Sequence, residues 1–552
     1  MALFSKKSIE GLLAESADTQ GMKKTLSAGA LVALGIGAII GAGLFSITGM
    51  AAANYAGPAI MISFVVAAIG CTFAGLCYAE FSSMIPVAGS AYTYSYATMG
   101  EFIAWIIGWD LVLEYAVGAA TVASSWSGYL SKFFESFGVS LPESLMKTPF
   151  DGGIINLPAI FIVTIMSLVL MRGTGESAKL NNIIVVLKVA IVLIFIAIGI
   201  KYVRPENLHP FIPKNEGPGK FGWSGILRAA GVVFFAYVGF DAVSTAAQET
   251  KNPKKAMPIG ILGSLVACTI LYILFAYVMT GVAPYKLFGE AGNELAPVAT
   301  AINHMGTPGA DGVIVPAYPW LNRVIIIAIL LGYSSVILVM LLGQSRVFYS
   351  MSKDGLLPSV FSKLHPKFKT PTRSNFFFLL FVSLFAAFIP GRIVGEMTSI
   401  GTLFAFILVC AGIIVLRKTN PNAPKAFQTP MVPLVPILGI VVCFAMMALL
   451  PLDTWIRLVI WMMIGFDVYL VRGIRKSHLA VNDTAADRKK ALRITSIVGL
   501  FVSLGLLGLA IAHHVTNDDA DGDKGIMILS GVVLVFHLIF YSINLLKANK
   551  EA

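Results

Sequence analysis

The chain has 552 residues, of which 57% are hydrophobic and only 12% are charged. Soluble chains are about a quarter charged, so this composition excludes a soluble multidomain protein. The net charge of +11 arises from 40 Lys and Arg against 29 Asp and Glu. Most of the basic residues fall in alternate loops between apolar runs, which is typical of the inner loops of a membrane protein and argues against a nucleic-acid partner.

The N-terminal region is polar as far as residue 24, and the first apolar run is too long for a cleaved signal peptide. We therefore expect residues 1–28 to form a cytoplasmic segment. From Thr25 to Ala79 no charged residue occurs, and this length is sufficient for two membrane crossings at about 20 residues each. The five cysteines lie in apolar runs without a C-x-x-C pair, so we expect no disulfide framework and no metal site.

Apolar runs bounded by charge, Pro or Gly predict about 14 transmembrane helices, with both termini in the cytoplasm. The runs lack the strict alternation of an outer-membrane barrel. The predicted spans lie near residues 29–55, 58–84, 93–127, 154–172, 181–203, 223–248, 257–283, 321–353, 374–390, 397–416, 434–451, 455–472, 493–512 and 525–547.

Glycines interrupt the first and the sixth of these spans. Residues 35–45 read GIGAIIGAGLF and residues 231–241 read GVVFFAYVGFD. The two spans are five apart and so cross in opposite directions, as in an inverted five-plus-five repeat. A break in mid-membrane frees N–H and C=O groups that lipid cannot satisfy, so it must line a cavity, where a zwitterion can bind them. The alternative explanation for the glycines is close packing between helices.

Four segments together resemble the amino acid–polyamine–organocation superfamily, and most closely bacterial members of its cationic amino acid transporter family. They are residues 35–48, 80–96, 235–241 and 252–259. The resemblance implies an all-α polytopic membrane protein with unwound first and sixth helices in its ten-helix core. The implied divisions are a first repeat at 29–203, a second at 223–416, two further spans at 434–472 and an additional helix pair at 493–547. That pair need not touch the site, and we expect its His537 to make a hydrogen bond between helices.

The resemblance also implies a substrate site at the two breaks. The substrate carboxylate would lie near the N–H groups around Ala42, where relatives often have Ser or Thr, and the ammonium near freed carbonyls. Phe235 resembles an aromatic gate, although most Phe residues in membrane helices only pack. Met340 would exclude Arg and Lys side chains if it lines the pocket, and otherwise it is a core residue. The implied substrate-binding residues are Ile40, Gly41, Ala42, Gly43, Phe235, Ala236, Tyr237, Gly239 and Met340.

Lys188 lies about two turns inside the fifth span, where an ammonium costs several kcal/mol unless it is paired. One explanation is that its side chain snorkels to the inner interface. The resemblance implies instead that this lysine takes the place of a sodium ion, near Ser334 and Ser335, and responds to the proton gradient. The other residues that we expect in proton coupling or gating are Glu114, Asp241 and Glu80, each of which could instead only pair or cap within the bundle.

We therefore predict a proton-coupled symporter that imports neutral, alanine-like L-amino acids across a bacterial inner membrane by alternating access. The alternatives are an exchanger or uniporter of cationic amino acids and, in another class, a membrane sensor or channel built on a transporter scaffold. We expect no enzyme, because neither a His/Asp cluster nor a G-x-S-x-G motif occurs. The expected partners are the amino acid and the lipid bilayer, without cofactor, sodium or nucleic acid; a monomer is expected, and a small membrane-protein partner is left open.

Overall fold

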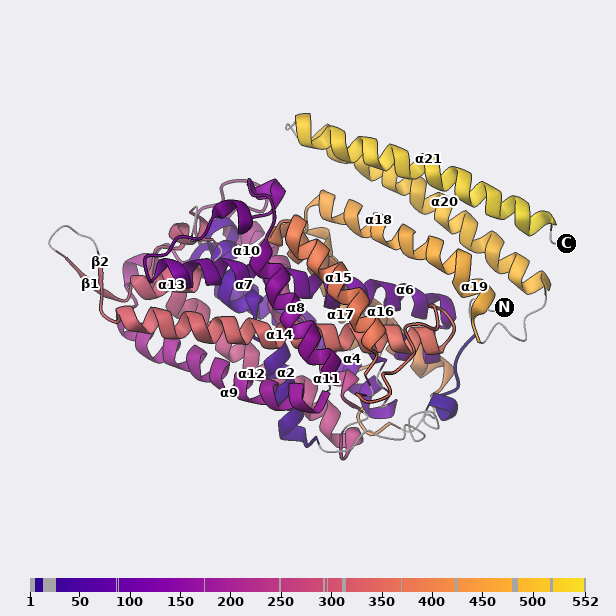
Figure 1. Cartoon of the computed structure of the whole chain (residues 1–552), viewed down its shortest axis with the longest axis horizontal. Coiled ribbons are helices and arrows are strands. Elements are labelled where there is room, and N and C mark those ends of the chain that lie inside the picture. Colours follow the sequence, from indigo (N-terminus) through magenta and orange to yellow (C-terminus); the bar gives the residue numbers. More distant parts are fainter. Residues whose placement is uncertain are drawn as a thin grey trace.

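Long helices make up nearly all of the regular structure of this polytopic membrane protein (Figure 1). The computed structural model describes residues 5–12, 26–85, 87, 89–172, 174–247, 250–290, 293–294, 296–309, 314–368, 370–421, 425–478, 485–516 and 520–550. Most of the expected N-terminal segment 1–28 lies outside the described residues, as do Pro86 and Ala88 of the 80–96 segment.

The first predicted repeat contains the helices up to residue 199. The expected third span at 93–127 is wrong at its start, because Gly100, with φ +101°, turns the chain between the short α5 and the long helix that begins at Glu101. The elements are α2 (Ala28–Ile39), η2 (Gly43–Ile47), α3 (Thr48–Ala51), η3 (Ala52–Ala56), η4 (Gly57–Ala59), α4 (Ile60–Met84), α5 (Ser90–Thr98), α6 (Glu101–Val112), η5 (Leu113–Val117), α7 (Gly118–Glu135), η6 (Glu143–Leu145), η7 (Pro149–Asp151), α8 (Leu157–Arg172) and α9 (Thr174–Gly199).

The second predicted repeat follows, together with an antiparallel hairpin in which Gly306 pairs with Pro316. In Figure 1 this hairpin projects from the end of the bundle opposite to both chain termini. The first repeat ends with η8 (Ile200–Tyr202), and η9 (Pro205–Leu208) lies between the two repeats. The elements of the second repeat are α10 (Gly222–Val233), η10 (Phe234–Tyr237), α11 (Ala242–Thr245), α12 (Pro253–Val282), η12 (Tyr285–Gly289), α13 (Pro297–Asn303), β1 (Gly306–Pro308), β2 (Ile314–Pro316), α14 (Pro319–Lys353), α15 (Thr372–Phe388) and α16 (Gly391–Thr419).

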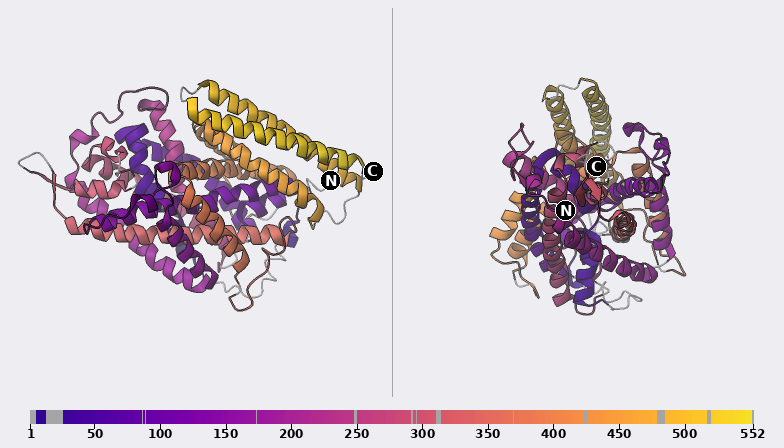
Figure 2. Two further views of the ribbon diagram at one scale, coloured as in Figure 1. Left: turned by 45° about the horizontal axis from the view of Figure 1, so that its top comes forward. Right: turned by 90° about the vertical axis from the view of Figure 1, so that its left-hand side faces the viewer.

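The remaining helices lie at one side of this core. Figures 1 and 2 show α20 and α21 side by side next to α18, against which α20 packs. His537 of α21 makes the interhelical hydrogen bond that the sequence predicts, with its Nε2 at 2.8 Å from Oδ2 of Asp467. The elements are α17 (Leu434–Ala448), α18 (Leu452–Val468), η13 (Tyr469–Gly473), α19 (Ile474–Lys476), α20 (Ala485–Thr516) and α21 (Ala520–Lys550).

The apolar helices agree with the predicted number of spans. Within the described part of the chain, nine helical segments are long and apolar enough to cross a membrane, and five shorter apolar helices accompany them. One segment, Gly43–Met84, contains the second half of the first span and all of the second, while Ala28–Ile39 is the first half of the first span. Counted in this way, the segments account for fourteen crossings.

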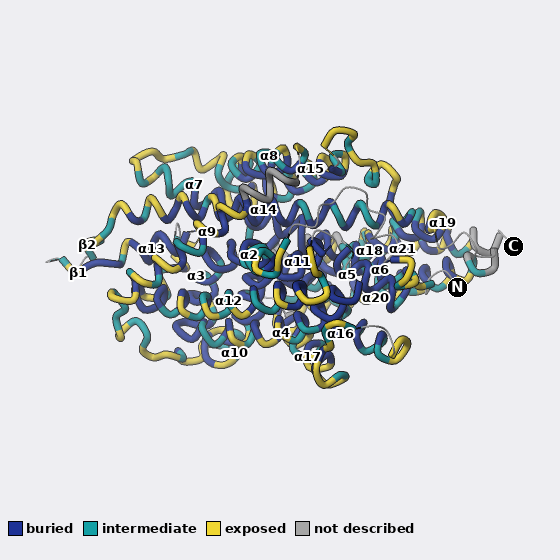
Figure 3. The backbone as a smooth tube through the Cα atoms, turned by 90° about the horizontal axis from the view of Figure 1, so that it is seen from below, coloured by how far each residue is buried: buried dark blue, intermediate teal, exposed yellow. Residues whose placement is uncertain are grey.

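Burial identifies the centre of the bundle. Among the long segments, Gly222–Thr245 and Pro319–Lys353 have the most buried apolar stretches, with 83% of each stretch buried. The sixth and eighth spans therefore lie innermost. Figure 3 shows the buried backbone in dark blue along the middle of the molecule. Large apolar side chains on the outside, such as Phe161 and Leu380, are exposed because this surface faces lipid rather than water.

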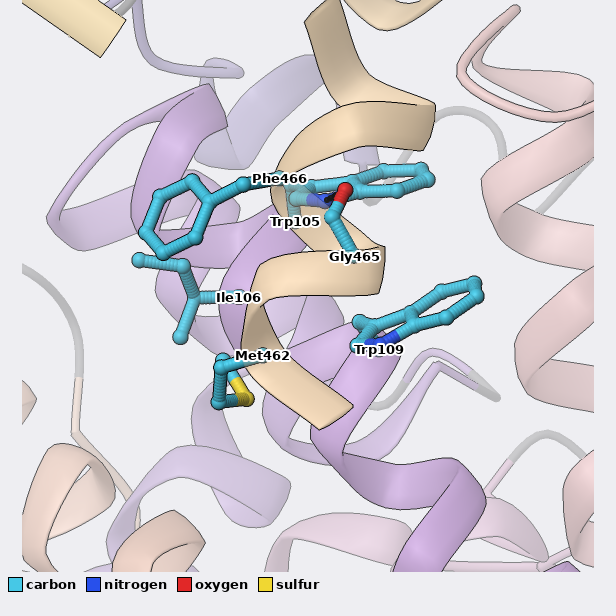
Figure 4. Close-up of a pocket in the computed structure, with 6 residues that line it drawn as sticks. All are labelled: Trp105, Ile106, Trp109, Met462, Gly465 and Phe466. Atoms are coloured by element: carbon cyan, nitrogen blue, oxygen red, sulfur yellow. Dashed lines mark hydrogen bonds between the residues drawn. The ribbon is translucent and has the colours of Figure 1, made fainter. Parts of the chain in front are cut away.

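Stacked indole rings join α6 to α18, beside the hollow drawn in Figure 4. The rings of Trp109 and Trp461 have centroids 4.9 Å apart, and each indole N–H donates to the carbonyl of the other residue, at 2.9 and 3.2 Å. Gly465 allows this approach, since a Cβ there would overlap the ring of Trp109. The contact fixes α6, which continues directly into the turn that carries Glu114.

Candidate functional site

The first span is broken between α2 and η2. α2 ends at Ile39, Ile40 is extended with φ −71° and ψ 106°, and a π-helical turn begins at Gly43. A helix that starts here leaves its first N–H groups without partners in the helix, and these belong to Gly41, Ala42 and Gly43. All three residues are buried, so the break presents backbone donors inside the bundle.

Lys188 of α9 is completely buried and supplies the carbonyls at this break with a donor. Its Nζ donates to the carbonyls of Gly37 and Ile40, the latter at 2.9 Å, and to Oγ of Ser335 at 3.0 Å. The side chain therefore does not snorkel. The contact expected with the eighth span occurs at Ser335, whereas Ser334 donates to its own helix.

Tyr272 of α12 connects the two breaks, a contact that no sequence pattern predicts. Its hydroxyl lies 3.0 Å from the carbonyl oxygen of Ile39 and 2.7 Å from that of Ala236. A tyrosine hydroxyl carries a single hydrogen, so it cannot donate fully to both carbonyls at once. One carbonyl of the pair thus keeps spare acceptor capacity in a fully buried place.

The sixth span is broken after α10. It passes through the 3₁₀ turn η10, and the chain then extends at Val238 and turns left-handed at Gly239, where φ is +106°. Only glycine adopts this φ readily. A Cβ on Gly239 would also lie 3.2 Å from that of Ala38, in the last turn of α2 before the first break.

The backbones of the two breaks meet directly. A Cβ on Gly43 would overlap the backbone of Ala236, so both glycine-rich segments are needed for this close approach. The structure therefore brings together the predicted residues of the first and sixth spans, which are about 190 positions apart in the sequence. This juxtaposition holds whether or not the glycines also serve packing.

The carbonyls expected to receive a substrate ammonium already have donors within the protein. The carbonyl of Phe235 accepts from the N–H of Val238 at 3.2 Å, that of Ile40 from Lys188, and that of Ala236 from Tyr272. Each carbonyl has two lone pairs, so each can accept a second hydrogen bond. Phe235 itself is 4% exposed and packs in the core.

Met340 lies one helical turn from the wall of the first break. Val336 of α14 contacts Gly41, where a Cβ would be 3.0 Å from Cγ2 of the valine, and Met340 follows four residues later on the same face. The sulfur of Met340 would be 3.3 Å from a Cβ on Gly118, which places it against α7. The side chain is buried where the third, eighth and tenth spans meet, since Thr398 lies beside the same glycine.

Two of the predicted acids lie beside each other. Glu114 of η5 and Asp241, just before α11, are both fully buried, and the hydroxyl of Tyr115 donates to Oδ2 of Asp241. Neither oxygen of Glu114 has an N–H or O–H donor among the described side chains. Two carboxylates cannot donate to one another, so a hydrogen bond between them requires a proton on one.

Glu80 is fully paired. Its carboxylate is fully buried and accepts from Nε and Nη2 of Arg417, both at 3.0 Å, and from the N–H of Thr429 at 2.7 Å. Such a two-pronged contact with a guanidinium orients both groups. The ion pair ties α4 to the end of α16, and a gating role for Glu80 stays a prediction.

Hydrogen bonds that the sequence did not predict join neighbouring helices on both sides of the breaks. On one side of the breaks, the hydroxyl of Tyr129 donates to the carbonyl of Phe45 at 2.6 Å, and Ser46 bonds Tyr333 at 2.8 Å. On the opposite side, Lys7 of the N-terminal segment pairs with Asp354, which also accepts from Tyr92 at 2.6 Å. Among the residues that the structure describes, no cluster of three or more metal-ligating side chains occurs.

Known proteins resemble this chain over most of its length. A family model described as amino acid permease matches residues 26–467. The chain is 43% identical over 484 residues to the branched-chain amino acid permease BcaP of Bacillus subtilis (strain 168), and 42% identical over 480 residues to the methylthioribose transporter of the same organism; each match covers 87% of this chain and 99% of the relative. Cationic amino acid transporter 4 of Mus musculus is 33% identical over 423 residues, which cover 76% of this chain and 64% of that one.

Proposed function

Because the chain belongs to the amino acid permease family of the amino acid–polyamine–organocation superfamily, we propose that it is a proton-coupled symporter of neutral L-amino acids. The substrate would bind between the two breaks, with its carboxylate on the N–H groups of residues 41–43 and its ammonium on the carbonyls of residues 40 and 235–237. Alternating access would proceed by movement of the broken helices against the surrounding scaffold.

The position of Lys188 is the observation that carries the proposal. A protonated lysine has three N–H donors, and three acceptors surround it: two carbonyls of the first span and Ser335 of the eighth. A neutral amine has only two N–H donors, so loss of the proton releases one acceptor. Protonation is thereby linked to the geometry of the break that holds the substrate carboxylate, and a protein-borne cation makes a sodium ion unnecessary there.

Glu114 and Asp241 are proposed as a second element of the coupling. Both carboxyl groups are fully buried, where a charge is costly, so one of them would carry a proton, and Asp241 lies immediately beyond the break of the sixth span. Movement of that span would separate the two groups and alter where the proton resides. Glu80 would hold the inner gate through its ion pair with Arg417.

Met340 supports a neutral substrate. The thioether is buried at the meeting of three spans and occupies volume that a long cationic side chain would need. A second candidate, an exchanger or uniporter of cationic amino acids, is favoured by the carboxyl group of Glu114, which lies about one turn before Gly118 on the same helix. One relative is a branched-chain amino acid permease, another a cationic amino acid transporter and a third a methylthioribose transporter, so the relatives support both amino acid classes.

We also propose the location and the divisions of the chain. A bacterial cytoplasmic membrane with both termini inside agrees with the basic loops and with an even number of spans. The repeats would be residues 29–203 and 223–416, followed by spans at 434–472 and the pair at 493–547. The proposed active form is a monomer, with a small membrane protein left open as a partner and no cofactor.

Uptake into proteoliposomes tests the proposal. Purified protein would be offered radiolabelled alanine, leucine, arginine or methylthioribose with an inward proton gradient, a sodium gradient or neither. The expected result is accumulation of alanine and leucine that needs the proton gradient and ignores sodium. Arginine movement without a proton requirement would favour the second candidate, methylthioribose as the sole substrate would refute the substrate class, and no flux of any compound would favour a sensor or channel.

A further inference from the structure

Basic side chains are concentrated where the core ends and the C-terminal helix pair begins. From residue 472 to residue 493 the sequence has seven Lys and Arg against two Asp, which is several times the density of basic residues in the whole chain. The described basic side chains of this group are all exposed or half-buried; we name them the C-terminal basic group, and they are Arg472, Arg475, Lys476, Lys489, Lys490 and Arg493.

The fold brings the two halves of this group to the same place. η13 and α19 carry the first three cations, and α20 carries the other three in its first turns. α20 packs against α18, η13 and α19, and in Figures 1 and 2 α19 and the beginning of α20 lie at the same end of the bundle. Nε of Arg472 is buried there and has no hydrogen-bond partner among the described atoms. The cations thus form one surface instead of two separate loops.

An exposed apolar stripe continues from these cations along α20. Arg493, Ile497 and Phe501 are spaced by four residues and therefore lie on one face of the helix. Ile497 is 41% exposed and Phe501 is 73% exposed, while Val471, next to Arg472 on the facing helix, is 58% exposed. Charge at the end of a membrane helix followed by exposed apolar side chains is complementary to a molecule with an anionic head and a hydrocarbon tail.

We propose that the C-terminal basic group binds the headgroup of an anionic phospholipid whose acyl chains lie along Ile497 and Phe501. The bound phosphate bridges cations of the core and cations of α20, and it offsets their mutual repulsion. The lipid therefore holds the C-terminal helix pair against α18, in addition to the hydrogen bond between His537 and Asp467. The proposed lipid site lies beyond residue 467, where the match to the family ends.

Lipid retention by the full-length protein tests the proposal. Native mass spectrometry would measure binding of phosphatidylglycerol, of phosphatidylcholine and, as a competitor, of inorganic phosphate. The site variant combines Lys489→Gln, Lys490→Gln and Arg493→Gln. A matched control combines Lys251→Gln, Lys254→Gln and Lys255→Gln, which removes the same charge from exposed positions at the start of α12.

The expected result is specific loss at the site. Each basic residue near an anionic lipid contributes about a fivefold factor, so three of them should weaken phosphatidylglycerol binding by about a hundredfold, while the control variant binds as the wild type does. Equal retention by both variants, equal loss in both, or equal binding of phosphatidylcholine would overturn the proposal. Displacement by inorganic phosphate at the same concentration would show a free-anion site instead.

A second variant keeps the test decisive if the triple variant does not fold. Phe501→Gln leaves every cation in place and removes only the proposed contact with the acyl chain, at an exposed position that does not support the core. It should lower the affinity for phosphatidylglycerol about tenfold, because about 1–2 kcal/mol of apolar contact is lost. Unchanged lipid affinity in this variant would refute the placement of the chains along α20.

Discussion

Replacement of Lys188 by alanine removes the three hydrogen bonds that its ammonium donates at the first break. Two of the acceptors are carbonyls at a helix end, and each buried carbonyl left without a donor costs about 1–3 kcal/mol. The break should therefore lose about 2–6 kcal/mol, which shifts a conformational equilibrium by about 30-fold to about 10⁴-fold. The variant also no longer buries an ammonium, so we expect the rest of the chain to fold.

Two transport assays separate coupling from binding in this variant. We expect accumulation driven by a proton gradient to fall at least tenfold, while counterflow of labelled substrate between equal concentrations persists in part. Lys201→Ala is the matched control, because this exposed lysine lies in η8, the short turn that directly follows α9. Accumulation by Lys188→Ala that keeps the pH dependence and extent of the wild type would refute the coupling role.

Three other predictions concern the pocket and its two ends. Met340→Ser should open the pocket, so that arginine competes with alanine uptake, whereas Met340→Leu should not; an unchanged specificity profile in the serine variant would remove Met340 from the pocket. Tyr272→Phe leaves a buried carbonyl of the breaks without a donor, so the free energy of unfolding should fall by about 1–3 kcal/mol; thermal unfolding equal to that of the wild type would contradict this. Lys7→Ala removes the partner of Asp354 and should raise the ratio of efflux to uptake, whereas Lys6→Ala, at an exposed neighbouring position, should not; equal ratios in both variants would show that the N-terminal segment does not hold this end closed.

The agreement between sequence and structure is best for features that a short stretch of chain determines. The span ends, the two breaks and the burial of Lys188 depend on runs of apolar residues and on glycines within about ten positions of each other. The error at the third span has the same origin. An uncharged run continues through α5, and Gly100, which leaves the right-handed region, separates this short helix from the span.

The contacts at the site could not be obtained in this way. Arg417 is 337 residues from Glu80, and the bond between Ser46 and Tyr333 joins positions 287 apart. Nothing in the apolar run of α12 distinguishes Tyr272 from a tyrosine that only packs. Its role at both breaks depends on which face of α12 meets α2 and η10.

The sequence by itself determined that this is a polytopic membrane protein of about fourteen spans, with two helices weakened by glycine and one lysine buried beside them. The two weakened helices and the buried lysine can be recognised in the sequence because free backbone groups and charge are costly in lipid, and this cost arises within each segment itself. Only the tertiary structure decided how those groups are satisfied. Donors for the freed carbonyls come from Lys188 and Tyr272, on helices whose mutual rotation is set by the packing of the whole bundle and not by any local pattern.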